Sequence, residues 1–299
     1  MRLKKAIPVV AVVVVLALGG FAQAEMYLEG YMGGAFPLAS SMGATTAHNT
    51  SYPLGIPVFT WEDHSINGGF KPAFQGGGKL GLWFDRSGVL SGINFPGWMK
   101  YFGFYLDLSY HRLDVGRERM TSKGTIGNFP NLNDKVQGFV PAGINNNFWS
   151  EGDAFTLAFM FAARYGFLKD SEVPFGRLQP YLGVGPAILF SSMHPSLQSA
   201  VNNSSPQPYA FGGIRYTLKP ESDSAVNVAL AVEAGLRWMA LKNVSVDLSF
   251  KYRYAKPSYT FNYTDRTFFA PINPPINTSF TLSPTLHIMS FQLGAAYHF

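Results

Sequence analysis

The chain has 299 residues, no cysteine and a formal net charge of +5. Charged residues make up 14% of the sequence, against about 25% in typical globular proteins, and aromatic residues make up 15%. The absence of cysteine excludes disulfides, thiolate metal sites and cysteine nucleophiles. The small positive charge gives no reason to expect a nucleic-acid partner.

The first 24 residues have the pattern of a cleaved secretory signal peptide. A basic start is followed by the apolar run Ala6–Leu18 and by a small-x-small cleavage site at Ala22–Ala24. The apolar run is too short for a membrane-spanning helix, which needs about 20 residues. Cleavage would leave one domain, residues 25–299, with 20 basic and 18 acidic residues and a net charge of +2.

Eight segments of this domain alternate between two kinds of side chain, which is the two-residue period of a β-strand with two different faces. They are Met26–Phe36, Gln75–Phe84, Tyr101–His111, Asp153–Phe167, Pro180–Phe190, Val226–Met239, Val244–Ala255 and Thr285–Phe299.

The connections between these segments alternate in length. Pro37–Pro72, Leu113–Gly152, Ser191–Ser224 and Lys256–Pro284 read as long polar loops, and the connections between them are shorter. This order predicts an up-and-down transmembrane barrel with short periplasmic turns and long extracellular loops, whereas a soluble sandwich would show no such asymmetry. Eight strands are expected, or ten if the third loop contributes a hairpin. Loop aromatics such as Phe148–Trp149 would pack loop on loop or contact a partner.

One face of the predicted strands is apolar, and the ionisable residues lie on the other face. A charge on the lipid face near the bilayer midplane would cost about 2–4 kcal/mol, so we expect these residues to face the barrel interior. An eight-stranded barrel is just wide enough for its side chains to fill it. The sequence therefore predicts a paired polar plug, with a narrow pore or a ligand cavity lined by the inward bases as the alternative. The residues are Glu29, Lys79, Asp107, Arg164, Glu233, Arg237, Asp247, Lys251 and Arg253.

An enzymatic interpretation depends on Asp107, Ser109 and His111, which share one face of a strand. Their spacing along a single strand is too wide for a hydrogen-bonded triad. The sequence contains no phosphate-binding loop, dinucleotide fingerprint or metal-binding histidine spacing. We therefore expect no catalytic site, cofactor or metal, and a lipid-modifying enzyme is only the second alternative.

The last strand carries a family resemblance. Its pattern Gln292-x-Gly294-x-x-Tyr297-x-Phe299 resembles the C-terminal assembly signal of bacterial outer-membrane β-barrels. The segments Gln179–Gly185 and Asn243–Asp247 look like those of small OmpA-, OmpW- or opacity-type barrels.

The resemblance implies an integral protein of the Gram-negative outer membrane, expected to be monomeric. It also implies contacts with outer-membrane lipids and lipopolysaccharide, and with periplasmic chaperones and the barrel-assembly machinery. The expected role is structural or surface-interacting. The first alternative is a narrow, porin-like transporter for small or hydrophobic solutes.

Overall fold

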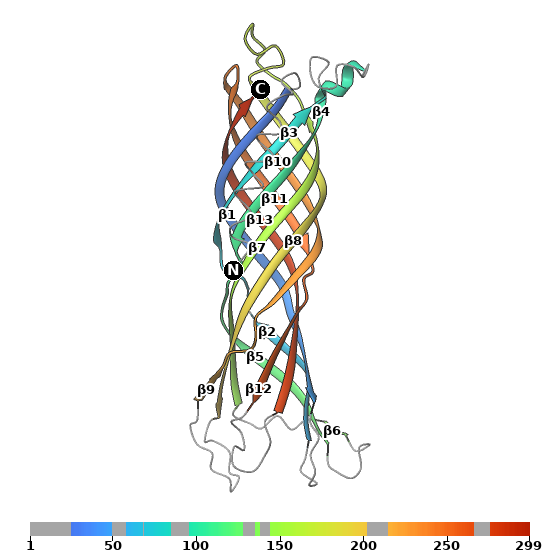
Figure 1. The fold of residues 1–299 in the computed structure, drawn as a ribbon, viewed down its shortest axis with the longest axis vertical. Helices are drawn as coiled ribbons and strands as arrows, with labels where there is room; N and C mark the ends of the chain where they lie inside the picture. Colours follow the sequence, from blue (N-terminus) through green and yellow to red (C-terminus); the bar gives the residue numbers. More distant parts are fainter. Residues whose placement is uncertain are drawn as a thin grey trace.

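The computed structural model describes residues 25–49, 58–67, 69–84, 96–127, 135–137, 144–201, 215–265 and 276–299. The predicted signal peptide, 1–24, lies outside the described residues. The thirteen strands found in these ranges belong to one antiparallel sheet, which forms a long barrel (Figure 1). No helix in the described ranges is long and apolar enough to cross a membrane.

Eight of the described strands close into a ring. β13 pairs with β11 on one side and with β1 on the other, and the backbone N–H of Phe299 donates to the carbonyl of Met26 at 2.9 Å. The predicted up-and-down barrel with eight strands is therefore confirmed. Around the ring the strands are β1 (Glu25–Asn49), β3 (Ala73–Trp83), β4 (Phe102–Arg112), β7 (Ile144–Arg164), β8 (Leu178–Val201), β10 (Asp223–Leu241), β11 (Val244–Ala255) and β13 (Ile276–His298).

The remaining strands extend the barrel at one end. We call the end with Phe299 and the tight β10–β11 turn the turn end, and the opposite end the loop end (Figure 1). Near the loop end, β2 pairs with β1 and β5, and β5 pairs with β7, so β2 and β5 continue the wall beyond β3 and β4. These strands are β2 (Val58–Asn67), β5 (Val115–Gly127), β6 (Lys135–Gln137), β9 (Arg215–Leu218) and β12 (Tyr259–Asp265).

The predicted boundaries of the long loops were wrong, because strands occupy much of each segment. β1 continues to Asn49, β7 begins at Ile144, β8 continues to Val201 and β13 begins at Ile276. Phe148, predicted to be a loop residue, lies in β7, is buried in the barrel and packs against Phe280, with ring centroids 6.0 Å apart.

The outer face of the wall changes character between the two ends. On β13 it is apolar or small from Met289 to Phe299, eleven residues, and polar from Ser279 to His287. A transmembrane β-strand needs about 9–11 residues, so the apolar part matches one crossing. The same change occurs on neighbouring strands, at the paired positions Arg112, Asp153, Ser192 and Ser224 and at Lys256, which follows β11. We call the positions of this change the border: Arg112, Asp153, Ser192, Ser224, Lys256 and His287.

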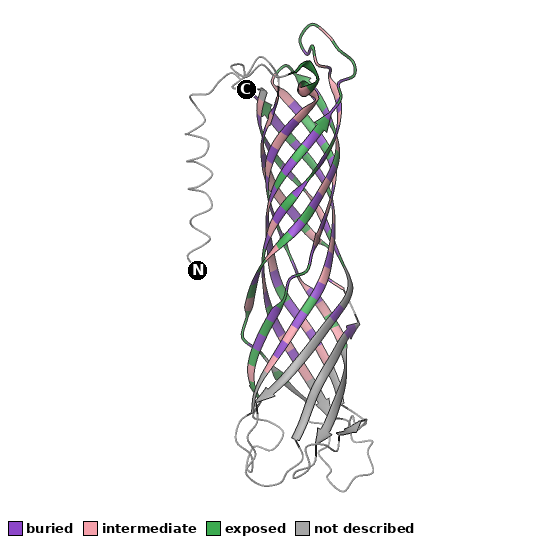
Figure 2. Cartoon of the chain, turned by 90° about the vertical axis from the view of Figure 1, so that its right-hand side faces the viewer, coloured by how far each residue is buried: buried purple, intermediate pink, exposed green. Residues whose placement is uncertain are grey.

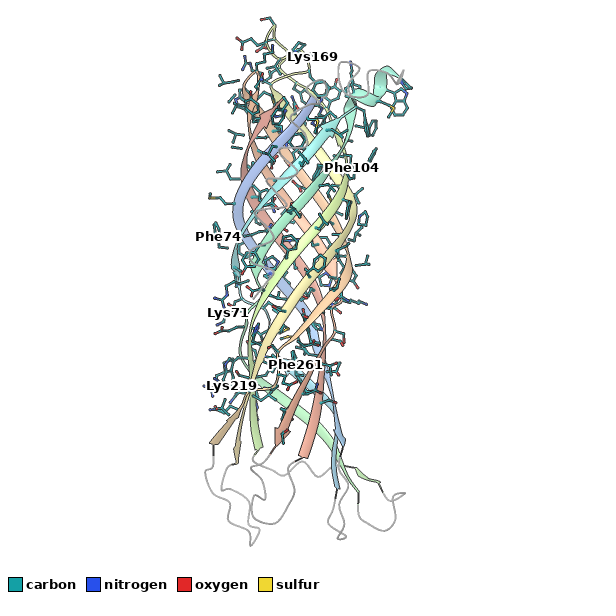
Figure 3. The ribbon with its side chains drawn as sticks, viewed as in Figure 1. Lys71, Phe74, Phe104, Lys169, Lys219 and Phe261 are labelled. Carbon is teal, nitrogen blue, oxygen red and sulfur yellow. The ribbon has the colours of Figure 1, made fainter. Side chains whose placement is uncertain are left out.

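The inner face changes in the opposite sense. Figure 2 shows the buried and exposed residues that alternate along the strands of the wall. On the turn-end side of the border, which we call the membrane section, the interior holds the buried charged residues. Beyond it, in the loop-end section, most buried inward side chains are apolar, although Ser150 is buried there too. The apolar ones include Leu113, Phe148, Met193, Phe261, Phe280 and Leu282. Figure 3 shows Phe104 on the membrane section and Phe261 in the loop-end section. The membrane section therefore has the polarity of a membrane barrel, and the loop-end section that of a soluble one.

The strand pairing of β1 is interrupted on one side, and we call this interruption the seam. β1 pairs with β3 as far as Ala35–Ala73 and with β2 from Met42–Ile66 onward, and the described residues show no ladder pairing between these points. Pro37 and Pro72 lie on the two edges of the seam. Proline has no N–H to donate to a ladder, which explains why the pairing lapses there.

The short connection between β7 and β8 is ordered by Asp170. Its carboxylate accepts the backbone N–H of Val173 at 2.7 Å and that of Glu172 at 3.0 Å, and it also pairs with Arg177. The pKa of Asp170 lies below its usual value. The hydrogen bond from the Val173 N–H contributes most to this lowering, and the Arg177 guanidinium contributes next.

This connection is expected to loosen in acid. Because the pKa of Asp170 is lower in the folded turn, its stabilisation is present above the ordinary carboxyl pKa and is lost as pH falls through the folded value. Amide hydrogen exchange at Val173 should accelerate on acidification, after correction for the intrinsic pH dependence of exchange. In Asp170→Asn the protection should be low at every pH. A pH-independent protection in the parent protein would contradict this assignment.

Candidate functional site: the barrel interior

All nine ionisable residues predicted on the inward phase lie inside the barrel, each with an exposed fraction of 3% or less. Seven of them form one contiguous group, which we call the charge cluster. The other two, Arg164 and Arg253, are held by different partners. The charge cluster consists of Glu29, Lys79, Asp107, Glu233, Arg237, Asp247 and Lys251.

Lys79 is at the centre of the charge cluster. Its ammonium lies 2.8 Å from Glu29 Oε1, 2.6 Å from Glu233 Oε1 and 3.7 Å from Asp247 Oδ1. The second oxygen of Glu233 lies 3.2 Å from the ammonium of Lys251, which also pairs with Asp107. Each of these charges has a partner of opposite sign, as burial in a low-dielectric interior requires.

Arg237 links the remaining carboxylates. One of its terminal nitrogens donates to Glu29 Oε2 at 2.6 Å, and its Nε lies 3.4 Å from Asp247 Oδ2. The guanidinium carbon lies 4.2 Å from the centre of the Tyr27 ring, within the range of a cation–π contact. The charge cluster thus holds four acids and three bases, and Arg253 follows Lys251 two residues later on the same face.

Two of these ion pairs cross the full width of the lumen. Lys79 of β3 meets Glu233 of β10, and Lys251 of β11 meets Asp107 of β4. In each case the two strands are four places apart in either direction around the ring of eight. The bridging side chains therefore occupy the middle of the barrel rather than lining an open path.

Arg253 is buried, and its hydrogen-bond acceptors are uncharged side chains. Its two terminal nitrogens donate to Gln75 Oε1 at 2.6 Å, Ser109 Oγ at 2.9 Å, Ser290 Oγ at 2.9 Å and Thr156 Oγ1 at 3.2 Å. These partners come from β3, β4, β13 and β7, so the side chain forms a second layer across the lumen. At the turn end, Arg164 donates to Gln179 at 3.1 Å and lies over the rings of Trp83 and Phe175.

The sequence prediction did not include the tyrosines of the interior. Tyr31 donates to Asp107 at 2.5 Å, Tyr105 to Glu233 at 3.2 Å, and the Tyr181 hydroxyl lies 2.8 Å from both Glu233 and Asp247. A signal was present for two of them, since Tyr31 shares the inward parity of Glu29 and Tyr105 that of Asp107.

Glycines make room for these rings. Tyr181 pairs across the ladder with Gly235, where an added Cβ would lie 2.4 Å from the tyrosine ring. Gly235→Ala is therefore expected to displace Tyr181 and destabilise the barrel by about 1–3 kcal/mol, the usual cost of overpacking. Gly30→Ala is the matched control, because an added Cβ there meets nothing within 4 Å. Chemical unfolding in lipid vesicles would measure both, and equal losses would contradict the packing argument.

The residues considered for catalysis enter different networks. Asp107 pairs with Lys251, Ser109 accepts from Arg253, and the Nδ1 of His111 lies 2.9 Å from the carbonyl of Arg112. A different pair, Ser245 and His298, lies 2.9 Å apart and is buried near the turn end. Within the described ranges, no group of three or more His, Asp or Glu side chains is placed to hold a metal ion.

The residues of the predicted assembly signal lie on the strand that closes the ring. Gln292 faces inward and accepts a hydrogen bond from Ser249 at 3.3 Å. Gly294 also faces inward, next to Glu29. Tyr297 and Phe299 are exposed on the outer face with ring centroids 5.2 Å apart, at the turn-end edge of the apolar band.

The comparisons with known proteins give similarities of low degree. No protein-family model and no curated protein matches the chain. Among solved structures, the chain is similar to Neisserial surface protein A, with 10% identity, coverage of 93% of this chain and 99% of that chain, and a TM-score of 0.39. It is also similar to OprG of Pseudomonas aeruginosa, with 10% identity, coverage of 91% of this chain and 96% of that chain, and a TM-score of 0.38. A major outer membrane protein of Thermus thermophilus is similar at 13% identity, with coverage of 91% of this chain and 99% of that chain and a TM-score of 0.38.

The assignment of this chain to a class rests on its own geometry. A closed antiparallel ring with an even number of strands, an apolar outer band and a polar interior is the architecture of bacterial outer-membrane barrels. All three features are present here. The protein is an integral outer-membrane β-barrel.

Proposed function

We propose that the protein is a closed barrel whose role is structural or surface-interacting, with the loop-end section as the part that meets the cell exterior. The observation that carries this proposal is the pair of ion bridges across the lumen, Lys79–Glu233 and Lys251–Asp107. Arg253 adds a second polar layer, and the apolar side chains of the loop-end section add a third. A hydrated ion has no evident route through three such layers.

Electrical conductance tests this proposal. Protein purified from membranes and shown to be folded by heat-dependent gel mobility should produce no steady current steps in a planar bilayer. A variant without either bridge, with Lys79→Ser, Glu233→Ser, Lys251→Ser and Asp107→Ser, should still produce no steps, because the layers formed by Arg253 and by the apolar side chains of the loop-end section remain. Steady steps from the unaltered protein would overturn the closed-barrel proposal and favour a pore lined by the interior bases.

The seam supports a second candidate function, passage of small hydrophobic solutes through the wall. It lies at the loop-end edge of the apolar band, where Phe36 and Leu38 are exposed on the outer face. Behind it lie the buried apolar residues Met42, Ile66 and Phe70. A solute dissolved in the membrane could enter here without passing the charge cluster.

A disulfide across the seam separates the two candidates. The chain has no cysteine, so Phe36→Cys with Pro72→Cys introduces the only thiols. Uptake of a fluorescent hydrophobic dye into protein-containing vesicles should stop on oxidation and recover with reductant. The absence of protein-dependent uptake in the unaltered barrel would remove this second candidate and leave the closed-barrel proposal unaffected.

A further inference from the structure

The outer surface of the loop-end section has a hydroxyl-rich region. The carboxylate of Asp223 lies at its edge and accepts the backbone N–H of Thr260 at 2.7 Å. β12 and β13 pair there so that three cross-strand pairs face outward, Ser258–Ser283, Thr260–Thr281 and Asn262–Ser279. The hydroxyl oxygens are 3.0 Å apart in the first pair and 3.2 Å in the second. We call these six residues the hydroxyl face. Their apolar neighbours Tyr259, Phe261 and Phe280 point into the barrel.

The surface formed by β4, β5 and β7 is different, because it carries charges that neutralise one another. Arg112 lies 3.1 Å from Asp114 and 3.7 Å from Glu151. Arg117 lies over the ring of Trp149, 5.2 Å from its centre. An anionic partner would meet acids as well as bases there, whereas the six side chains of the hydroxyl face carry no charge themselves.

The chemistry along β11, β12 and β13 changes in a fixed order away from the membrane. The apolar residues Phe291 and Leu293 come first, followed by Tyr252 and His287, whose Oη and Nδ1 atoms are 2.7 Å apart. The exposed ammonium of Lys256 comes next, and the hydroxyl face follows. Among the described residues, no carboxylate lies within ion-pair distance of Lys256.

A phosphorylated glycolipid has the same order of groups: acyl chains, phosphate and then sugars. Aromatic residues favour the interface, an ammonium binds phosphate, and uncharged donors and acceptors match the hydroxyls of sugars. We propose that this strip of β11, β12 and β13 binds one glycolipid of the outer leaflet, with Lys256 at its phosphate and the hydroxyl face along its sugar chain. This inference rests on the membrane placement in the proposed function and names one partner for the loop-end section.

Binding of two lipid probes to the purified, folded protein tests this inference. Full-length lipopolysaccharide has phosphates and a sugar chain, whereas lipid A has the phosphates without the core and outer sugars. Thr260→Val with Thr281→Val should bind lipopolysaccharide about tenfold more weakly, since it removes several hydrogen bonds, and should bind lipid A unchanged. Lys256→Gln should weaken binding of both probes. Arg117→Gln, on the charged surface, is the control and should change neither.

The inference would be overturned if the double valine variant bound lipopolysaccharide as the unaltered protein does, or if Arg117→Gln weakened binding equally. Equal affinity of the unaltered protein for the two probes would also overturn it. Asn262→Val with Ser279→Val provides a second variant if the first does not fold. Conductance distinguishes the two proposals: current steps would contradict the closed barrel, while loss of the lipopolysaccharide preference alone would contradict only the glycolipid site.

Discussion

Replacing Lys79 with methionine is expected to destabilise the folded barrel by about 3–5 kcal/mol, the usual result of removing one partner from a buried ion pair. The ammonium lies within 4 Å of three carboxylates, those of Glu29, Glu233 and Asp247, and all four side chains are buried. Methionine has a similar length but no charge, so the carboxylates would remain close together with less compensation. Urea unfolding in lipid vesicles, followed by tryptophan fluorescence, would measure the loss.

Two further variants make this result specific. Lys242→Met makes the same substitution in the exposed β10–β11 turn and should leave stability within about 0.5 kcal/mol of the parent protein. Adding Glu233→Gln to Lys79→Met should recover part of the loss, because it removes one of the uncompensated carboxylates and leaves Lys251 paired with Asp107. Additive losses in the double variant would contradict the direct coupling of Lys79 and Glu233.

The membrane section was predictable because one physical rule governs both of its faces. Lipid on the outside and a narrow polar interior force a two-residue alternation, which is clear in Val244–Ala255 and in Val226–Met239. This alternation identified the strands and the inward parity of the ionisable residues. The partners of those residues were not predictable, since which strands face one another across the lumen depends on the shear of the closed barrel.

The loop-end section was missed because its alternation is inverted and interrupted. On β13, Phe280, Leu282 and Leu286 alternate with Thr281, Ser283 and Thr285, which is a two-residue period. The serines, threonines and Pro284 also match the composition of a loop. Once the outer face is in water, a strand needs its apolar residues inside. The two-residue period therefore shows that the segment is a strand with its apolar residues inside, but the loop-like composition hides this pattern.

This inversion suggests why the barrel is longer than one membrane crossing requires. The membrane section buries charged residues and tyrosines with a few apolar side chains such as Trp83 and Met160, whereas the buried side chains of the loop-end section are mainly apolar, as at Phe148, Phe261 and Phe280. That apolar core sits directly on the layer formed by Arg253. The two sections therefore stabilise one continuous sheet by different means, ion pairing in the first and apolar packing in the second.

The same substitution, made on the two sides of the border on one strand, is expected to change the stability of the barrel by different amounts. Leu293 and Ser283 both face outward on β13, ten residues apart, and Leu293 lies near the middle of the apolar part, Met289–Phe299. Leu293→Arg should destabilise the barrel by about 2–4 kcal/mol, the cost of a cation on the lipid face near the bilayer midplane. Ser283→Arg should change stability by no more than about 0.5 kcal/mol, because the side chain would extend into water.

The same unfolding measurement in lipid vesicles decides between these values, with the parent barrel as reference. Comparable losses for the two variants would mean that Ser283 contacts lipid, and the border at His287 and Lys256 would then be misplaced. No loss for Leu293→Arg would mean that this face of β13 is covered by another protein surface rather than by acyl chains. A loss confined to Leu293→Arg places the water–membrane boundary between the two positions, where the polarity of both faces of the wall reverses.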